Sequence, residues 1–213
     1  MFENLQGFFE STLGQFVTVG VIALLFLFIL IPTKEQRTKR ADTKAVTLSA
    51  LLAALATGLG MLKLFEMPYG GTVTVFSMLP IVLCGYFLGT RRGVMAGMCV
   101  GLLNLIFGPY VIHPIQLLVD YPFAFGALGL AGICRNQKNG LAKGYLLGLF
   151  ARYVCAVVSG IVFFGAYAPE GFNAITWSLF YNFTYLAAEG ALTVIIISLP
   201  PVKKALEGLK NQL

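Results

Sequence analysis

"IQLLVDYPFAFGALGLAGICRNQK", residues 115–138, indicates the fold class of this chain. Residues 115–134 are apolar apart from Gln116 and Asp120, and basic residues follow directly. An α-helix needs about 20 such residues to cross the hydrocarbon core of a bilayer, which is roughly 30 Å thick. The stretch therefore predicts a transmembrane helix that keeps one carboxylate inside the membrane.

The same pattern recurs along the whole chain, of which 58% is hydrophobic and 11% charged. Soluble domains carry about 25% charged residues. The apolar runs are continuous rather than alternating, which favours helices over a β-barrel. We therefore predict an all-α integral membrane protein with seven spans, at residues 13–32, 45–62, 74–90, 93–107, 115–134, 145–165 and 174–200.

The basic residues predict the topology. If the seven spans alternate, thirteen of the 15 Lys and Arg residues fall on one side, which the positive-inside rule makes cytoplasmic. The N-terminus is then outside the cell membrane and the C-terminus cytoplasmic. This distribution explains the net charge of +6 without nucleic acid as a partner. The thirteen residues are Lys34, Arg37, Lys39, Arg40, Lys44, Arg91, Arg92, Arg135, Lys138, Lys143, Lys203, Lys204 and Lys210.

The chain divides into three parts. Residues 1–33 are predicted to hold an N-terminal transmembrane helix, retained because Glu3 and Glu10 make a poor signal-peptide start and no small-residue cleavage motif follows the apolar run. Residues 34–44 are predicted to be a basic cytoplasmic linker. Residues 45–213 then form a six-helix membrane domain.

Small residues mark two helix faces. The glycines that recur every four residues predict close helix packing, most simply within the chain, and they are Gly85, Gly89, Gly93, Gly97 and Gly101. Ala50 and Ala54 begin a second stripe, directly after the linker. That stripe is open to two interpretations, packing within the chain or contact with another subunit.

Catalysis and metal binding have little support. The chain has one histidine, and its four cysteines, Cys84, Cys99, Cys134 and Cys155, show no C-x-x-C spacing. We interpret the cysteines as packing residues and the chain as a protein that is not an enzyme, with no cofactor or metal of its own.

Three ionisable residues, Asp120, Arg152 and Glu189, fall within predicted spans. Such groups cost about 2.5–3.5 kcal/mol at a helix centre, so they pair with one another or serve a function. Arg152 could pair with either acid. Asp120 shares a helix face with Gln116 and His113, at i−4 and i−7, on the outer half of its span.

The loops predicted on the outer side are "KLFEMPYGGTV", "GPYVIHP" and "GAYAPEGFN", which are rich in Gly, Pro and aromatic residues. They predict a pocket that opens outward, although aromatic residues at this depth equally fit an interfacial belt. The predicted walls are Tyr69, Tyr110, Tyr167, Phe172 and Trp177. A carboxylate among aromatic rings, with Asn182 nearby to fix orientation, suits an aromatic cation. A stand-alone proton-coupled carrier or channel for a small cationic or aromatic solute remains the alternative.

Four separated motifs resemble the thiamine-specific substrate-binding (S) component, the ThiT/YuaJ family, of energy-coupling factor (ECF) transporters. They are "MPYGGTVTVFSMLPI" (67–81), "GPYVIHPIQLLVDYPFAFGALGLAG" (108–132), "SGIVFFGAYAPEG" (159–171) and "SLFYN" (178–182). The resemblance implies a six-helix body that binds thiamine from outside. It also implies a transmembrane coupling (T) subunit and two cytoplasmic ATPase subunits as partners. Those ATPases would use the ATP, because this chain has no phosphate-binding loop.

The resemblance also implies roles for single residues. Asp120 and Tyr121 match the family's acid-aromatic pair that holds the aminopyrimidine, and Ala50 and Ala54 match the stripe that docks on the coupling subunit. The predicted substrate-binding residues are Asp120, Tyr121, Tyr110, Trp177, Asn182, Phe164, Gln116, His113 and Tyr167. There are two departures from the family: Ala156 stands where many members have histidine, and the N-terminal helix lies outside the six-helix pattern.

Overall fold

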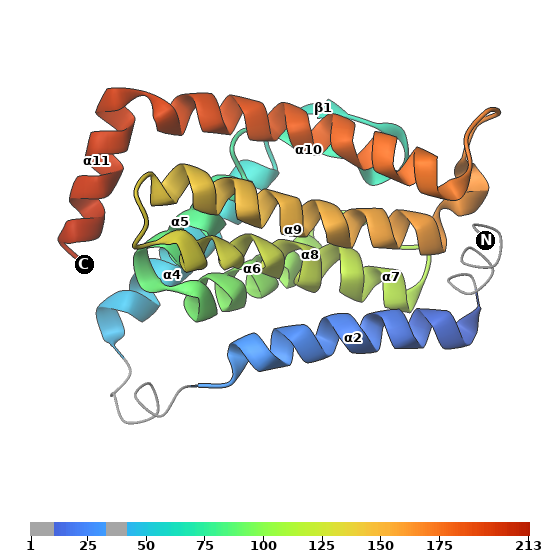
Figure 1. Cartoon of the computed structure of the whole chain (residues 1–213), viewed down its shortest axis with the longest axis horizontal. Helices are drawn as coiled ribbons and strands as arrows, with labels where there is room; N and C mark the ends of the chain where they lie inside the picture. Colours follow the sequence, from blue (N-terminus) through green and yellow to red (C-terminus); the bar gives the residue numbers. More distant parts are fainter. Residues whose placement is uncertain (1–10, 33–41) are drawn as a thin grey trace.

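The computed structural model describes residues 11–32 and 42–213, so most of the predicted linker lies outside the described residues. The described part is a helical bundle (Figure 1), which confirms the predicted all-α membrane fold. Five helical segments in it are long and apolar enough to cross a membrane. They are α2 (Thr12–Leu30), α4 (Thr43–Gly60), the segment Pro114–Cys134, α9 (Gly140–Phe163) and α10 (Ala174–Ser198).

Two predicted spans differ from the structure, the first in length and the second by a shift of three residues. The span predicted at 74–90 is α5 (Met78–Leu88), whose 11 residues reach about 16 Å, and that at 93–107 is α6 (Thr90–Asn104). The chain before α5 instead forms a hairpin of β1 (Lys63–Glu66) and β2 (Thr72–Thr74), joined by a turn at Pro68–Gly70. The loop predicted there is thus an antiparallel pair of strands.

The span predicted at 115–134 is a broken helix. It consists of α7 (Pro114–Leu118), a π turn (Val119–Phe123), α8 (Ala124–Ala127) and a 3-10 segment (Leu128–Cys134). Pro122 lies in the π turn, and proline has no N–H for the α-helical ladder. Single π turns in helices are frequent at functional sites. Asp120 and Tyr121 both lie on this turn.

The glycine face of α6 packs on the backbone of the broken helix. A Cβ atom on Gly97 would lie 2.3 Å from the carbonyl oxygen of Phe125, and one on Gly101 would lie 2.3 Å from that of Tyr121. Only glycine allows this approach, so packing within the chain is confirmed for these positions. Gly89 has a different role. It lies between α5 and α6, and its φ of 95° lets the chain turn from one helix into the next.

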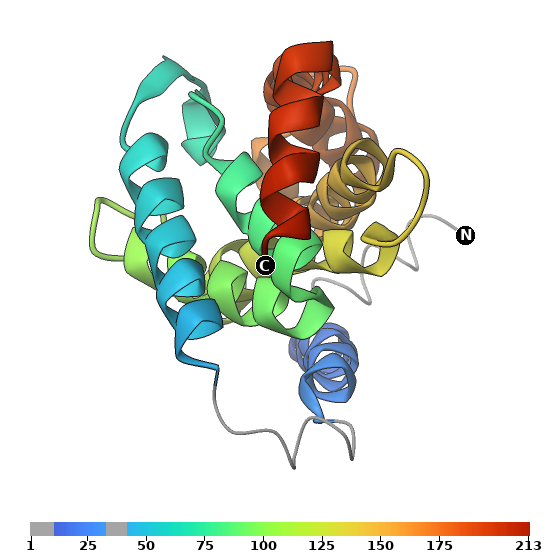
Figure 2. The same cartoon turned by 90° about the vertical axis from the view of Figure 1, so that its left-hand side faces the viewer.

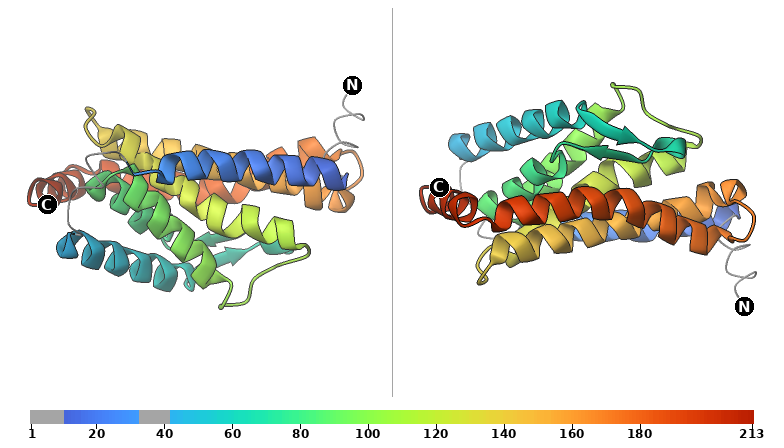
Figure 3. Two further views of the ribbon diagram at one scale, coloured as in Figure 1. Left: turned by 90° about the horizontal axis from the view of Figure 1, so that it is seen from below. Right: turned by 90° about the horizontal axis from the view of Figure 1, so that it is seen from above.

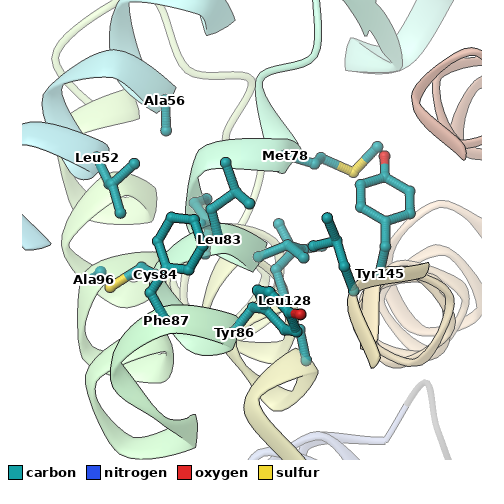
Figure 4. Close-up of a cluster of buried hydrophobic side chains, with 14 of the residues drawn as sticks. Leu52, Ala56, Met78, Leu83, Cys84, Tyr86, Phe87, Ala96, Leu128 and Tyr145 are labelled. Atoms are coloured by element: carbon teal, nitrogen blue, oxygen red, sulfur yellow. The ribbon is translucent and has the colours of Figure 1, made fainter. Parts of the chain in front are cut away.

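A buried hydrophobic cluster joins α4, α5, α6, the 3-10 segment and α9. Figure 4 shows Leu52 and Ala56 from α4 facing Leu83 and Phe87 from α5, while Tyr145 approaches from α9. On the other side of the bundle α10 runs along α9 (Figures 1 and 3). This scaffold leaves the hairpin and the start of α7 at one end of the molecule.

The opposite end holds the starts of α4, α6 and α9 together with α11 (Pro200–Asn211), which turns across the end of the bundle (Figures 1 and 2). This last helix was not predicted as a separate element. It is anchored by Lys210, whose Nζ lies 4.6 Å from the centroid of the Tyr86 ring and donates to the carbonyl oxygen of Arg135.

The N-terminal helix α2 lies along one side of the bundle, against α6, α7 and the π turn (Figures 1 and 3). Its last turn is fixed by Arg91, whose Nε donates to the carbonyl oxygen of Leu30 at 3.0 Å. Among the described residues of α2, Phe26 is the one large side chain that is buried in the body, and it is 7% exposed. Most of its other large apolar side chains are exposed.

Candidate substrate-binding site

A cavity of about 720 Å³ opens between the hairpin, the loop before α7, the π turn, α9 and α10. Small-molecule sites generally have volumes of about 300–1,000 Å³. The loops predicted to converge do so here, because a Cβ on Gly70 of the hairpin turn would lie 3.1 Å from Cβ of Tyr110. The cavity is therefore of the size and place expected for a ligand pocket.

Asp120 is held in the cavity wall by a buried amide. Gln116, which is 1% exposed, donates from Nε2 to Oδ2 of Asp120 at 2.6 Å. The same amide is fixed by the loop before α7, since its Nε2 also lies 3.2 Å from the carbonyl oxygen of Tyr110 and its Oε1 accepts from the Ile112 N–H at 3.2 Å. These bonds hold the carboxylate in one orientation.

Tyr121 ties the π turn to the same loop. Its hydroxyl oxygen accepts from the backbone N–H of Tyr110 at 2.8 Å. Because Tyr110 thereby contacts both Gln116 and Tyr121, the loop and the π turn form one hydrogen-bonded unit.

Aromatic rings continue around the outer rim of the cavity. Tyr110 stacks on Phe164 with centroids 6.0 Å apart, and Tyr69 of the hairpin lies 5.0 Å from Tyr167. The rings that line the cavity and follow one another in contact are Tyr110, Phe164, Tyr167, Tyr69, Tyr181 and Trp177. Such a rim offers several π faces to a cation or an aromatic ligand.

One face of α10 supplies polar groups. Asn182 is buried, and its Nδ2 donates to the carbonyl oxygen of Ser178 at 2.9 Å while its Oδ1 accepts from the Tyr185 hydroxyl at 2.9 Å. Nδ2 also approaches the carbonyl oxygen of Ala156 at 3.3 Å. The amide is thus oriented before any ligand arrives.

Glu189 has a structural role at the junction of β2 and α5. Its Oε2 accepts from the N–H and hydroxyl of Thr74, at 2.9 and 2.8 Å, and its Oε1 accepts from the Ser77 hydroxyl and the Met78 N–H, at 3.3 and 3.4 Å. A buried carboxylate needs such donors to offset the loss of water. Glu189 therefore fixes the hairpin to α10.

Neither acid forms an ion pair with Arg152 in the part of the chain that the structure describes. The ion pairs there are Lys63–Glu66 and Lys203–Glu207. The guanidinium of Arg152 instead lies 4.1 Å from the centroid of the Phe125 ring, in the cavity wall. Both pairings considered from the sequence are thus wrong for this conformation.

The structure brings most of the predicted ligand residues together. Those that line the cavity are Asp120, Tyr121, Tyr110, Trp177, Asn182, Phe164, Gln116 and Tyr167. His113 does not line it, because its Nδ1 accepts from the Ile115 N–H at the start of α7 and its ring stacks on Phe163. Phe172 lies outside the lining too, against Trp177 at 5.5 Å.

Among the tyrosines that line the cavity, Tyr181 and Tyr185 were not predicted from the sequence. Both follow Trp177 at intervals of four residues, so helical spacing places them on its face. Ala50 and Ala54, by contrast, are exposed on α4 and do not line the cavity.

Comparisons with known proteins agree with this architecture. Residues 46–207 match the family described as thiamine transporter protein (Thia_YuaJ). A curated relative, the thiamine transporter ThiT of Bacillus subtilis, is 31% identical over 179 residues, covering 78% of this chain and 91% of that protein. Another, from Lacticaseibacillus paracasei, is 30% identical over 172 residues, covering 70% of this chain and 82% of its own.

A solved structure of ThiT from Listeria monocytogenes shares the fold, with a TM-score of 0.62 and 24% identity over 74% of this chain and 94% of that one. The relatives are named transporters, which agrees with the interpretation that the chain is not an enzyme. With the family model covering most of its length, the chain belongs to the thiamine transporter (Thia_YuaJ) family.

Proposed function

We propose that this chain is the thiamine-binding specificity subunit of an ECF-type importer in the cell membrane, with its N-terminus outside and its C-terminus cytoplasmic. One observation carries the proposal: a fixed carboxylate, Asp120, lies in a cavity whose rim is a continuous series of aromatic rings. Thiamine combines an amino-substituted pyrimidine with a cationic thiazolium, and both parts find partners in such a cavity.

The carboxylate and the rings would divide the recognition between them. An ionised Asp120 only accepts hydrogen bonds, so it suits the amino group of the pyrimidine. The Tyr110–Phe164 pair and Trp177 offer faces to the aromatic rings and to the positive charge. Tyr121 and Asn182, each held by its own hydrogen bond, complete the walls.

Ligand analogues test this division. Trp177 is the only tryptophan and lines the cavity, so its fluorescence reports binding to the purified full-length chain. Pyrithiamine, which keeps the amino group and a cationic ring, should bind like thiamine. Oxythiamine, in which a carbonyl replaces the amino group, should bind at least about 100-fold more weakly. Its carbonyl oxygen and the Asp120 carboxylate are both hydrogen-bond acceptors and cannot pair. Equal binding of thiamine and oxythiamine, or no thiamine binding, would refute the proposal.

Energy would come from partner subunits. We expect the exposed face of α4 around Ala50 and Ala54 to dock on a transmembrane coupling subunit that is joined to two ATPases. Small residues on an exposed membrane helix permit close approach of a second helix. ATP would be used by the ATPases, with no cofactor in this chain.

Reconstitution tests the partners. Proteoliposomes that contain this chain, the coupling subunit and both ATPases should take up thiamine only with ATP. Ala50→Trp with Ala54→Trp should abolish assembly while leaving thiamine affinity intact. Ala188→Trp, at an exposed position of α10, serves as the matched control and should assemble normally. Uptake by this chain alone, driven by a pH gradient, would instead support a stand-alone carrier.

A further inference from the structure

The N-terminal helix α2 contacts the segment that carries the ligand residues. Its Phe26 ring lies 5.0 Å from the ring of Phe123, centroid to centroid, and Phe123 ends the π turn. Gly126 leaves room for this ring, because a Cβ there would lie 2.7 Å from Cε1 of Phe26. Phe26 thus fills a position in the body of the bundle rather than in the surrounding lipid.

The buried cluster around Phe26 lies behind the π turn. It contains Val119 and Phe123 from the two ends of the turn, between which Asp120 and Tyr121 point to the cavity. The remaining buried members are Val94, Ala124, Ala127 and Cys155. A π turn gives up regular α-helical hydrogen bonding, so its conformation depends on what packs around it.

The turn is therefore supported by two helices. From α6, Gly101 lies against the carbonyl oxygen of Tyr121, closely enough that a Cβ would be 2.3 Å away. The second helix is α2, which contacts α6, α7 and the π turn itself. The family match begins at residue 46, so this second support comes from outside the matched region.

We propose that Phe26 is a positioning residue for ligand binding: from α2 it holds the π turn so that Asp120 and Tyr121 face the cavity. The inference rests on the proposed function, because it assigns a remote support to that same binding site. Phe26 does not line the cavity, and its effect on affinity passes through the turn.

Thiamine affinity of single variants in the full-length chain tests the proposal. Phe26→Ala should raise the Kd about tenfold, within the range typical of coupling between two sites. Phe26→Leu, which refills most of the volume, should recover most of that loss. Phe28→Ala removes the same side chain from the same helix at a position that is 78% exposed, and it should leave the Kd unchanged.

Two further measurements separate positioning from general destabilisation. Amide hydrogen exchange of Phe26→Ala should rise in residues 119–123 and stay constant in the middle of α10. In an Asp120→Asn background, Phe26→Ala should lower the affinity much less than tenfold, because the two changes act on one contact.

The outcomes are distinguishable. If the unaltered chain does not bind thiamine, the proposed function fails. If it binds, but Phe26→Ala matches Phe28→Ala in affinity, or if the loss is the same with and without Asp120, the positioning role is refuted and the proposed function stands.

Discussion

The side-chain amide of Gln116 lies 2.6 Å from the Asp120 carboxylate, with Nε2 donating to Oδ2. The two residues are one helical turn apart, and Gln116 is almost fully buried. The amide therefore orients the only cavity-facing carboxylate on the π turn.

Replacement of Gln116 tests this orientation. Gln116→Met keeps the length of the side chain but removes a hydrogen bond to a charged group, worth about 1.5–3 kcal/mol. Thiamine affinity should therefore fall by about tenfold to 100-fold in calorimetric titration. Gln137→Met, at an exposed position, is the control. An unchanged Kd in Gln116→Met would show that Asp120 needs no such support.

Asp120→Asn should change selectivity as well as affinity. The new amide can donate as well as accept, so it can pair with the carbonyl of oxythiamine. We expect the preference for thiamine over oxythiamine to shrink or reverse in competition binding. A variant that keeps the full preference would place recognition of the amino group elsewhere.

Ala156 lines the cavity, at a position where the family resemblance led us to expect histidine. Ala156→His would add a hydrogen-bonding group beside Asn182, whose Nδ2 approaches the Ala156 carbonyl oxygen at 3.3 Å. Thiamine affinity should rise, by about fivefold to tenfold for one net hydrogen bond. Ala156→Phe, which fills the same space without a polar group, should instead lower the affinity.

Glu189 should contribute to stability rather than to ligand choice. Glu189→Ala leaves four donors at the junction of β2 and α5 without this acceptor and should lower the free energy of unfolding by about 3 kcal/mol. Glu189→Gln keeps an accepting oxygen and should cost less. Denaturant unfolding in detergent measures both, and Glu170→Ala, in an exposed loop, should have no effect.

The two helical glycines Gly101 and Gly58 should respond oppositely to alanine. Gly101→Ala forces a methyl group against the Tyr121 carbonyl oxygen and should destabilise the protein by about 1–3 kcal/mol while weakening thiamine binding. Gly58 has nothing within 4 Å of its Cβ position, so Gly58→Ala should stabilise by about 0.5–1 kcal/mol. Equal melting temperatures would contradict the close packing of α6.

Local sequence was sufficient for the long helices. The length and hydropathy of α2, α4, α9 and α10 are properties of continuous runs, so their positions could be predicted within a few residues. The hairpin could not be predicted in this way. It is fixed by bonds such as that from Thr74 to Glu189, across 115 positions of the chain, which no local pattern reveals.

The candidate site, like the fold, could be predicted from the sequence only in part. Residues on one helix face, such as Gln116 and Asp120, could be grouped from their spacing, and the structure joins them. His113 was placed on the same face, at i−7, but it is the N-cap residue of α7, and its ring accepts from a backbone N–H instead of facing the cavity. The partners of Arg152 and Glu189 depended on tertiary packing, and there the sequence predictions were wrong.

The hairpin is attached to its surroundings in two different ways. Hydrogen bonds join it to α10, from the Gly71 N–H to the Tyr181 hydroxyl at 2.9 Å and from Thr74 to Glu189. Its tip meets Tyr110 and Tyr167 on the other side of the cavity through ring and van der Waals contacts alone. The entrance to the cavity therefore has one rigid edge, where the hairpin is hydrogen-bonded to a membrane-spanning helix. At its other edge the hairpin tip can separate from Tyr110 and Tyr167 without breaking a hydrogen bond between them.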